Sequence, residues 1–278
     1  MGSRYYQLKD YELASVTTVI GACMDKSTPL MYWATNCMEK YLGDRIELFM
    51  AAAQMENQET GIKTIMDLLE QAKKNFRSVS KEARDIGSDT HAAIEAWLRN
   101  EPHDVPDRIS KPYHAAVQWF VDNDVEVLAI EKTVYSEKEW WAGTQDLKIK
   151  VVPTWADAGA NAGKECIYVI DNKTSKAFYE PDMPVQVNTY AAGEGNEDVD
   201  GTGVLRLDKE TGTPFFKDYT ATRAQDYVHF LCLRNAFYIA HAKKGVRLDF
   251  LNNYSGVMAE LIKLAAPVVP FKAQASLL

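Results

Sequence analysis

Two acids and one lysine near the middle of the chain could form a metal-dependent hydrolytic site. The strand-like run 167–170 ends in Asp171, and Lys173 follows two residues later. Side chains alternate along a strand, so Asp171 and Lys173 project from the same face. Asp146, on the preceding strand-like segment, would add a second carboxylate. Converging carboxylates suit one or two Mg²⁺ or Mn²⁺ ions, and such ions favour phosphodiester hydrolysis because they lower the pKa of a bound water.

Two further polar pairs follow helical spacing. His91 and Glu95 lie four residues apart, as do Gln186 and Tyr190, so each pair faces one side of a helix. Apolar residues surround the first pair within the segment 89–98, as expected for a packed helix with one polar edge. His91 is therefore a candidate third metal ligand.

Several short motifs follow one another along the chain: His91, then Gly143-Thr144-x-Asp146, then Asp171-x-Lys173 followed by Thr174-Ser175-Lys176, and then Gln186-x-x-x-Tyr190. In this order they resemble the RecB-type branch of the PD-(D/E)XK nuclease superfamily, over roughly residues 13–243. The start of the segment, Ser15-Val16-Thr17-Thr18, resembles the start of many phage and viral members. A second D-x-K, Asp146-x-Lys148, is a decoy, because only Asp171 and Lys173 precede Gln186 and Tyr190 at the family's distance.

The resemblance implies a role for each matched residue. His91, Asp146 and Asp171 would bind the metal, the backbone carbonyl of Asn172 would complete its shell, and Glu131 is a further acid near the metals. Lys173 would position or deprotonate the attacking water. Gln186 and Tyr190 would hold Lys173 or contact the scissile phosphate.

A second group of residues is expected to touch nucleic acid. Thr174, Ser175 and Lys176 follow the second acid directly and would meet the backbone, and Lys148 lies among the lysines around the acidic strands. Trp140 and Trp141 would present a ring for a nucleobase to stack on. The alternative for these tryptophans is that they cap the sheet core, and neighbours on a strand favour it because at least one points inward.

The resemblance implies a metal-dependent deoxyribonuclease, most simply an exonuclease that acts from DNA ends in replication, recombination or repair of a phage, viral or bacterial genome. Alternatives are a structure-specific or RNA-cutting endonuclease on the same core, and a non-catalytic nucleic-acid-binding module. The partner is DNA, as a single strand or a duplex end. A homo-oligomer and contacts with replication or recombination proteins stay open, as do digestion polarity and strand preference.

Composition fits an enzyme with a sizeable core, since 46% of the 278 residues are hydrophobic and 25% are charged. The net charge of −8 argues against a broad non-specific clamp on a polyanion, although it says little about a cleft. No membrane span or secretory segment is apparent, so a cytoplasmic location in a bacterial cell or phage-infected host is expected. The four cysteines include no C-x-x-C pair, and only Cys232 follows the core, so no iron-sulfur cluster is expected.

The elements that must position these residues change in type along the chain. Helices are predicted at 30–41, 45–54, 62–75, 81–98 and 111–123, with breaks at Gly43, Gly61 and the loop 101–106. Strands are predicted at 125–135, 143–152 and 165–171, a helix at 184–192, a hairpin from 203–207 and 214–217, and a helix at 223–243. The tail beyond Gly256 is ambiguous. We therefore expect an α/β fold with a central mixed sheet flanked by helices, a restriction-endonuclease-like core at 121–278, and a helical region at 1–120 that carries His91 and walls the cleft, together one integrated domain.

Overall fold

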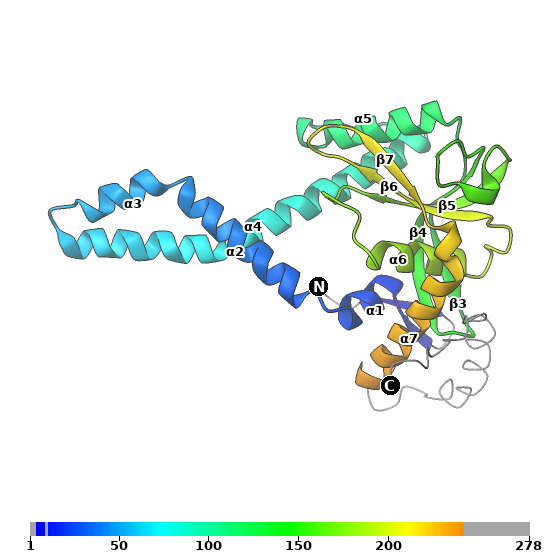
Figure 1. The fold of residues 1–278 in the computed structure, drawn as a ribbon, viewed down its shortest axis with the longest axis horizontal. Helices are drawn as coiled ribbons and strands as arrows, with labels where there is room; N and C mark the ends of the chain where they lie inside the picture. Colours follow the sequence, from blue (N-terminus) through cyan, green and yellow to red (C-terminus); the bar gives the residue numbers. More distant parts are fainter. Residues whose placement is uncertain (1–3, 9–10, 242–278) are drawn as a thin grey trace, which may run out of the picture. The chain divides into compact units, whose positions relative to one another are not determined.

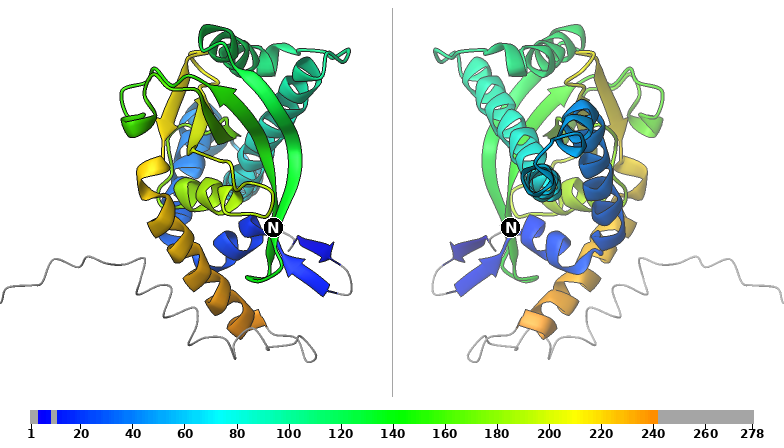
Figure 2. Two further views of the ribbon diagram at one scale, coloured as in Figure 1. Left: turned by 90° about the vertical axis from the view of Figure 1, so that its right-hand side faces the viewer. Right: turned by 90° about the vertical axis from the view of Figure 1, so that its left-hand side faces the viewer.

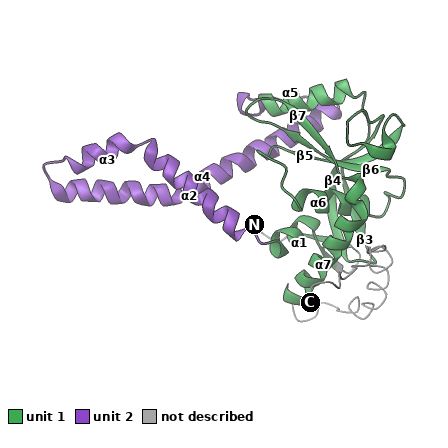
Figure 3. Cartoon of the chain, in the orientation of Figure 1, with its two compact units in different colours: residues 1–24, 111–278 green, residues 25–110 purple. Residues whose placement is uncertain are grey.

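The computed structural model describes residues 4–8 and 11–241, which fall into two compact units (Figure 3). A sheet unit takes the described residues of 1–24 and 111–278, and a helical unit takes 25–110. The sequence predicts residues 1–24 as part of the helical region, but the described residues among them belong to the sheet unit. The Ala14 N–H donates to the Tyr238 hydroxyl at 3.0 Å, and Ser15 forms a β-bridge with Ala142.

Three helices make up most of the helical unit: α2 (Ser27–Gly43), α3 (Ile46–Ala53) and α4 (Gln58–Leu98) (Figure 1). The helices predicted at 62–75 and 81–98 are one helix of 41 residues, so the separation expected between them is wrong. At its start the Asn57 side chain accepts a hydrogen bond from the Thr60 N–H at 3.1 Å, which satisfies one of the unpaired donors at a helix N-terminus.

Gly61 lies inside α4 and does not break it, which corrects the prediction. A side chain at Gly61 would overlap the carbonyl of Ala52, at the end of α3. The glycine is therefore explained by close packing between two helices, and its cost within a helix, about 1 kcal/mol, is small enough to be tolerated.

The sheet unit contains a five-stranded mixed sheet in the order β3-β4-β5-β6-β7. Only β5 and β6 are parallel, and the other neighbours are antiparallel. The strands are β3 (Glu126–Ser136), β4 (Trp141–Val151), β5 (Cys166–Lys173), β6 (Gly201–Leu207) and β7 (Pro214–Asp218). The structure thus confirms an α/β fold with a mixed central sheet flanked by helices and a helical region towards the N-terminus.

Helices cover both faces of this sheet (Figure 2). On one face α1 (Val16–Cys23), α6 (Asp182–Ala191) and α7 (Arg223–His241) pack together over an apolar core. On the other face α5 (Asp107–Asp122) contributes Trp119, whose ring stacks on Phe216 of β7 with centroids 5.1 Å apart. The first face carries Asp171, so the candidate site lies on the side of α6.

The sequence analysis did not predict the short N-terminal hairpin of β1 (Tyr5–Leu8) and β2 (Tyr11–Ala14), or helix α1. Ser15 begins α1 by accepting the Thr18 N–H at 3.0 Å. The predicted helix 223–243 is described as far as His241, and the tail beyond Gly256 lies outside the described residues. None of the described helices has the length and apolarity needed to cross a membrane.

Candidate active site

Two neighbouring strands bring the predicted acids together. Leu147 of β4 pairs with Ile170 of the antiparallel strand β5. Asp146, just before Leu147, and Asp171, just after Ile170, therefore lie opposite one another. The Asn172 N–H donates to Asp146 Oδ2 at 2.8 Å. This hydrogen bond fixes the orientation of the Asp146 carboxylate beside β5.

Lys173 forms an ion pair with Asp171, whose carboxylate is almost completely buried. The two residues share a face of β5, as the alternation along the strand predicted. Gln186 on α6 donates from Nε2 to Asp171 Oδ1 at 2.8 Å and contacts the Tyr190 hydroxyl at 3.3 Å. The structure therefore joins Asp171 to the helical pair that follows it, whereas Gln186 is not seen to hold Lys173 itself.

The charge of Lys173 is set by two opposing effects. Burial alone would lower the pKa of its ammonium, but the carboxylates of Asp171, Asp146 and Glu131 outweigh burial and raise that pKa. Lys173 is therefore a firmly protonated donor among three acids.

Tyr190 is buried, and burial followed by the nearby Asp171 and Asp146 carboxylates raises the pKa of its phenol well above the usual value. Its ring packs against Gly143, where a side chain would overlap it. The next residue, Thr144, shares a hydrogen bond of 2.8 Å with the Tyr6 hydroxyl. These contacts explain why a glycine and a threonine precede the first acid.

Glu131 lies on β3 between the pairs Ile130–Leu147 and Lys132–Gln145, a register that sets it opposite Asp146. Its backbone has φ of 48°, a left-handed conformation that is unusual for a residue with a side chain. Carboxylate oxygens of Glu131 and Asp146 lie within 4.8 Å of each other. Backbone strain within a strand is typical of functional positions, and here it accompanies a third acid.

The acids fit a hard divalent cation. Three carboxylates face one ammonium, so the group carries excess negative charge, and carboxylate oxygens are the ligands that Mg²⁺ and Mn²⁺ prefer. His91 lies on α4 of the helical unit, and its role as a ligand stays a prediction. The same holds for the carbonyl of Asn172, for which the structure gives only the N–H contact.

The segment predicted to meet a nucleic-acid backbone follows Lys173 directly. Thr174 and Ser175 are half-buried and Lys176 is exposed. Arg206 of β6, which the sequence analysis missed, donates from Nη1 to the carbonyl oxygens of Ser175 at 3.4 Å and Lys176 at 3.2 Å. Arg206 therefore holds this segment in place next to the acids.

Two other predicted nucleic-acid contacts, Lys148 and Trp141, are buried. Lys148 is buried and donates to Asp198 at 2.5 Å, so its ammonium is engaged inside the protein. Trp141 is fully buried in the apolar core. Trp140 is half-buried, and its role as a stacking residue stays a prediction. The core-capping alternative is therefore correct for Trp141, because its ring has no exposed face.

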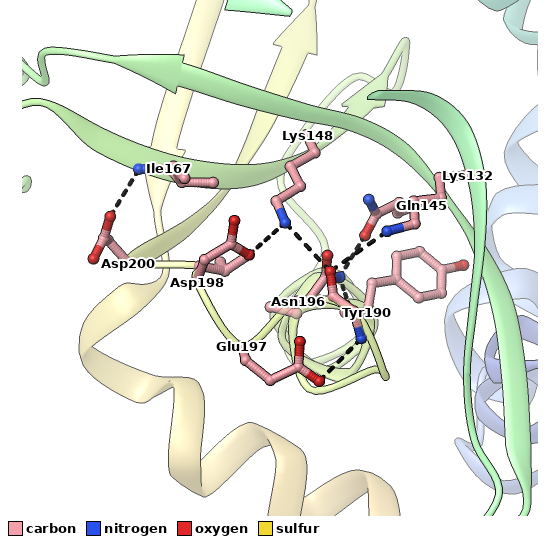
Figure 4. A network of polar contacts seen from close by, with 12 residues as sticks. Lys132, Gln145, Lys148, Ile167, Tyr190, Asn196, Glu197, Asp198 and Asp200 are labelled. Atoms are coloured by element: carbon pink, nitrogen blue, oxygen red, sulfur yellow. Dashed lines mark hydrogen bonds and ion pairs between the residues drawn. The ribbon is translucent and has the colours of Figure 1, made fainter. Parts of the chain in front are cut away.

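Figure 4 shows a polar network in which the buried residues Asn196, Gln145 and Tyr190 are joined by hydrogen bonds. Asn196, in the loop after α6, donates from Nδ2 to Gln145 Oε1 at 2.7 Å and to the Tyr190 carbonyl at 2.9 Å. It ties the strand residue preceding Asp146 to the end of the helix that carries Tyr190. The sequence offered no signal for Asn196, because its partners are distant in the chain.

No protein-family model matches the chain, and the search of curated proteins found no significant match. The resemblance to PD-(D/E)XK nucleases rests on the order and spacing of the motifs that contain His91, Asp146, Asp171, Lys173, Gln186 and Tyr190.

Proposed function

We propose that the chain is a metal-dependent nuclease with a restriction-endonuclease-like core, most simply an exonuclease acting from DNA ends. One observation carries the proposal: the Lys173 ammonium is paired with the buried Asp171 carboxylate, next to Asp146 on the adjacent strand. A buried carboxylate beside a lysine and a second acid is costly to maintain for stability alone, and it is the arrangement that cation-assisted phosphoryl chemistry needs.

Asp146, Asp171 and Glu131 would hold the cation, with His91 and the Asn172 carbonyl as the further ligands expected from the sequence. When bound, Mg²⁺ or Mn²⁺ would neutralise charge building on the phosphate and lower the pKa of the attacking water. Lys173 would donate to that water or to a phosphate oxygen. Gln186 would keep the Asp171 carboxylate oriented, and the un-ionised Tyr190 hydroxyl would support Gln186.

Cleavage assays on end-labelled linear and closed circular DNA, with Mg²⁺, Mn²⁺ or EDTA, test this proposal. We expect metal-dependent loss of the linear substrate only, and its abolition in Lys173→Ala and Asp146→Asn. Lys164→Ala, which removes an exposed lysine on the loop before β5, is the matched control and should stay active. Full activity of both site variants would contradict the assignment.

The same assay separates the alternatives. Cleavage of the circle would identify an endonuclease, and cleavage of RNA alone would change the substrate. Binding of nucleic acid without turnover in Mn²⁺ would point to a non-catalytic module.

A further inference from the structure

The sheet register leads from Lys173 to an exposed aromatic side chain at the sheet edge. Lys173 of β5 pairs with Arg206 of β6, and Arg206 pairs with Phe215 of β7, the edge strand. Paired residues share a face, so the three side chains form one row on the face that also carries Asp171. Two strand spacings, about 10 Å, separate its ends, a distance that a few linked nucleotides span.

The Arg206 guanidinium, in the middle of this row, lies over two aromatic rings. The Arg206 guanidinium carbon lies 4.3 Å from the centroid of the Phe215 ring and 5.5 Å from that of Phe178. Arg206 is buried and holds the carbonyl oxygens of Ser175 and Lys176, so it supports Phe215 from a fixed position. Phe215 nevertheless remains 42% exposed. A rigidly supported aromatic ring with an open surface is suited to stacking on another planar group.

Two cations of this surface, Arg206 and Lys217, are paired with carboxylates. Arg206 Nη1 lies 3.1 Å from Asp208 Oδ2, and Lys217 forms an ion pair with Glu180. The charges of Arg206 and Lys217 are therefore already balanced by protein carboxylates, and Phe215 offers its ring rather than a charge. The surface is better suited to nucleobases than to the backbone of a duplex, whose bases keep their faces covered.

We propose that Phe215, supported by Arg206 and Phe178, is a stacking platform for a base of an unpaired nucleic-acid strand that leads to Asp171 and Lys173. This inference rests on the proposed nuclease function, and it specifies single-stranded nucleic acid as the form bound next to the site. In other systems a base stacked on an aromatic side chain contributes about 1 to 3 kcal/mol to binding.

Fluorescence anisotropy in EDTA tests the platform without any requirement for cleavage. A labelled oligothymidylate and a blunt duplex of equal length are titrated with wild type and with Phe215→Ala, Phe215→Leu and Phe215→Trp. We expect the alanine and leucine variants to bind the single strand about tenfold more weakly, and the tryptophan variant to bind at least as well as wild type. Duplex binding should stay unchanged, and the loss should be the same at low and high salt because stacking releases no counterions.

The control is Tyr32→Ala, which removes an exposed aromatic ring from α2 and should leave binding unchanged. Thermal melts establish that the Phe215 variants are folded, and the leucine variant keeps apolar volume if alanine destabilises the edge strand. Equal single-strand affinity of wild type and Phe215→Leu would overturn the platform.

Cleavage measured in parallel separates this inference from the proposed function. If Phe215→Leu loses single-strand binding but wild type cleaves nothing with any metal, the stacking platform is supported and the nuclease assignment is wrong. If cleavage depends on Lys173 but substitution of Phe215 does not change strand binding, the nuclease assignment stands and the stacking platform is wrong.

Discussion

The Tyr190 ring occupies the space that a side chain on Gly143 would need. Because Gly143 lies three residues before Asp146, and Tyr190 contacts Gln186, this contact links the strand of the first acid to the helix behind the second. The fit of a ring against a bare backbone sets how closely α6 approaches the site.

Gly143→Ala should therefore destabilise the fold and reduce catalysis together. The added methyl group must displace the Tyr190 ring, and overpacking of this kind costs about 1 to 3 kcal/mol. Urea unfolding and cleavage rates measure the two effects. Gly21→Ala is the control, since among the described residues no atom beyond the neighbouring helix backbone lies within 4 Å of its added methyl group in α1, and it should be neutral or stabilising.

The lysines of the two D-x-K patterns should differ in their effect on cleavage. Lys148→Met should leave cleavage largely intact but lower the free energy of unfolding by about 1 to 3 kcal/mol, because the buried lysine loses its charged hydrogen bond to Asp198. Lys173→Met should abolish cleavage and also destabilise the fold, because it leaves the buried Asp171 carboxylate without its ion-pair partner. Denaturant unfolding and initial cleavage rates of both variants check this. The reverse pattern would move the catalytic role to Lys148.

The charged residues of the site could be predicted from local sequence, whereas the residues that hold them in place could not. Asp171 and Lys173 lie two residues apart on one strand, so their shared face depends only on the strand period. The prediction that Asp146 lies near them required only that the two strands be adjacent in the sheet. Asn196 and Arg206 act through partners that loop paths and sheet register bring together, and neither can be read from spacing.

The Asn196 network should stabilise the site as well as the fold. Asn196→Ala removes two buried hydrogen bonds and leaves the Gln145 oxygen without its donor, so we expect a loss of about 2 to 4 kcal/mol. Cleavage at a temperature where the variant is fully folded should also fall, since α6 loses its tie to β4. The control is Lys132→Ala, which removes a long contact of 3.4 Å to the same loop and should change unfolding by less than about 0.5 kcal/mol. Unchanged stability of Asn196→Ala would contradict this role.

Acid should weaken the turn between β6 and β7. Asp208 accepts hydrogen bonds from the Thr211 N–H, the Arg206 guanidinium and the Glu210 N–H, and these lower its pKa to about 2. The unfolded value is about 3.9. A carboxylate with a lowered folded-state pKa stabilises the protein above the unfolded value, and this stabilisation disappears as the pH falls towards 2.

Wild type should therefore be more stable than Asp208→Asn near neutral pH, and the difference should shrink between about pH 4 and pH 2. Urea unfolding at a series of pH values measures it. Glu210→Gln removes a carboxylate from the same turn while keeping the backbone donor, so it should show no such convergence. If the stability difference between wild type and Asp208→Asn stayed constant with pH, the contribution of Asp208 would not depend on its charge.

His91 offers the most direct test of the ligand set that the motif order implies. An imidazole nitrogen that completes a shell of carboxylates adds affinity for Mn²⁺, so His91→Ala should weaken Mn²⁺ binding at least tenfold. Cleavage should fall with it, while the helix content seen by circular dichroism stays unchanged. Glu95→Gln is the control, because Glu95 lies one turn further along the same helix and is paired with Arg99 at 2.8 Å. Calorimetric titration of Mn²⁺ into each variant measures the affinities. Equal affinity of wild type and His91→Ala would leave Asp146, Asp171 and Glu131 as the protein's side-chain ligands, and would assign His91 to the packing of α4.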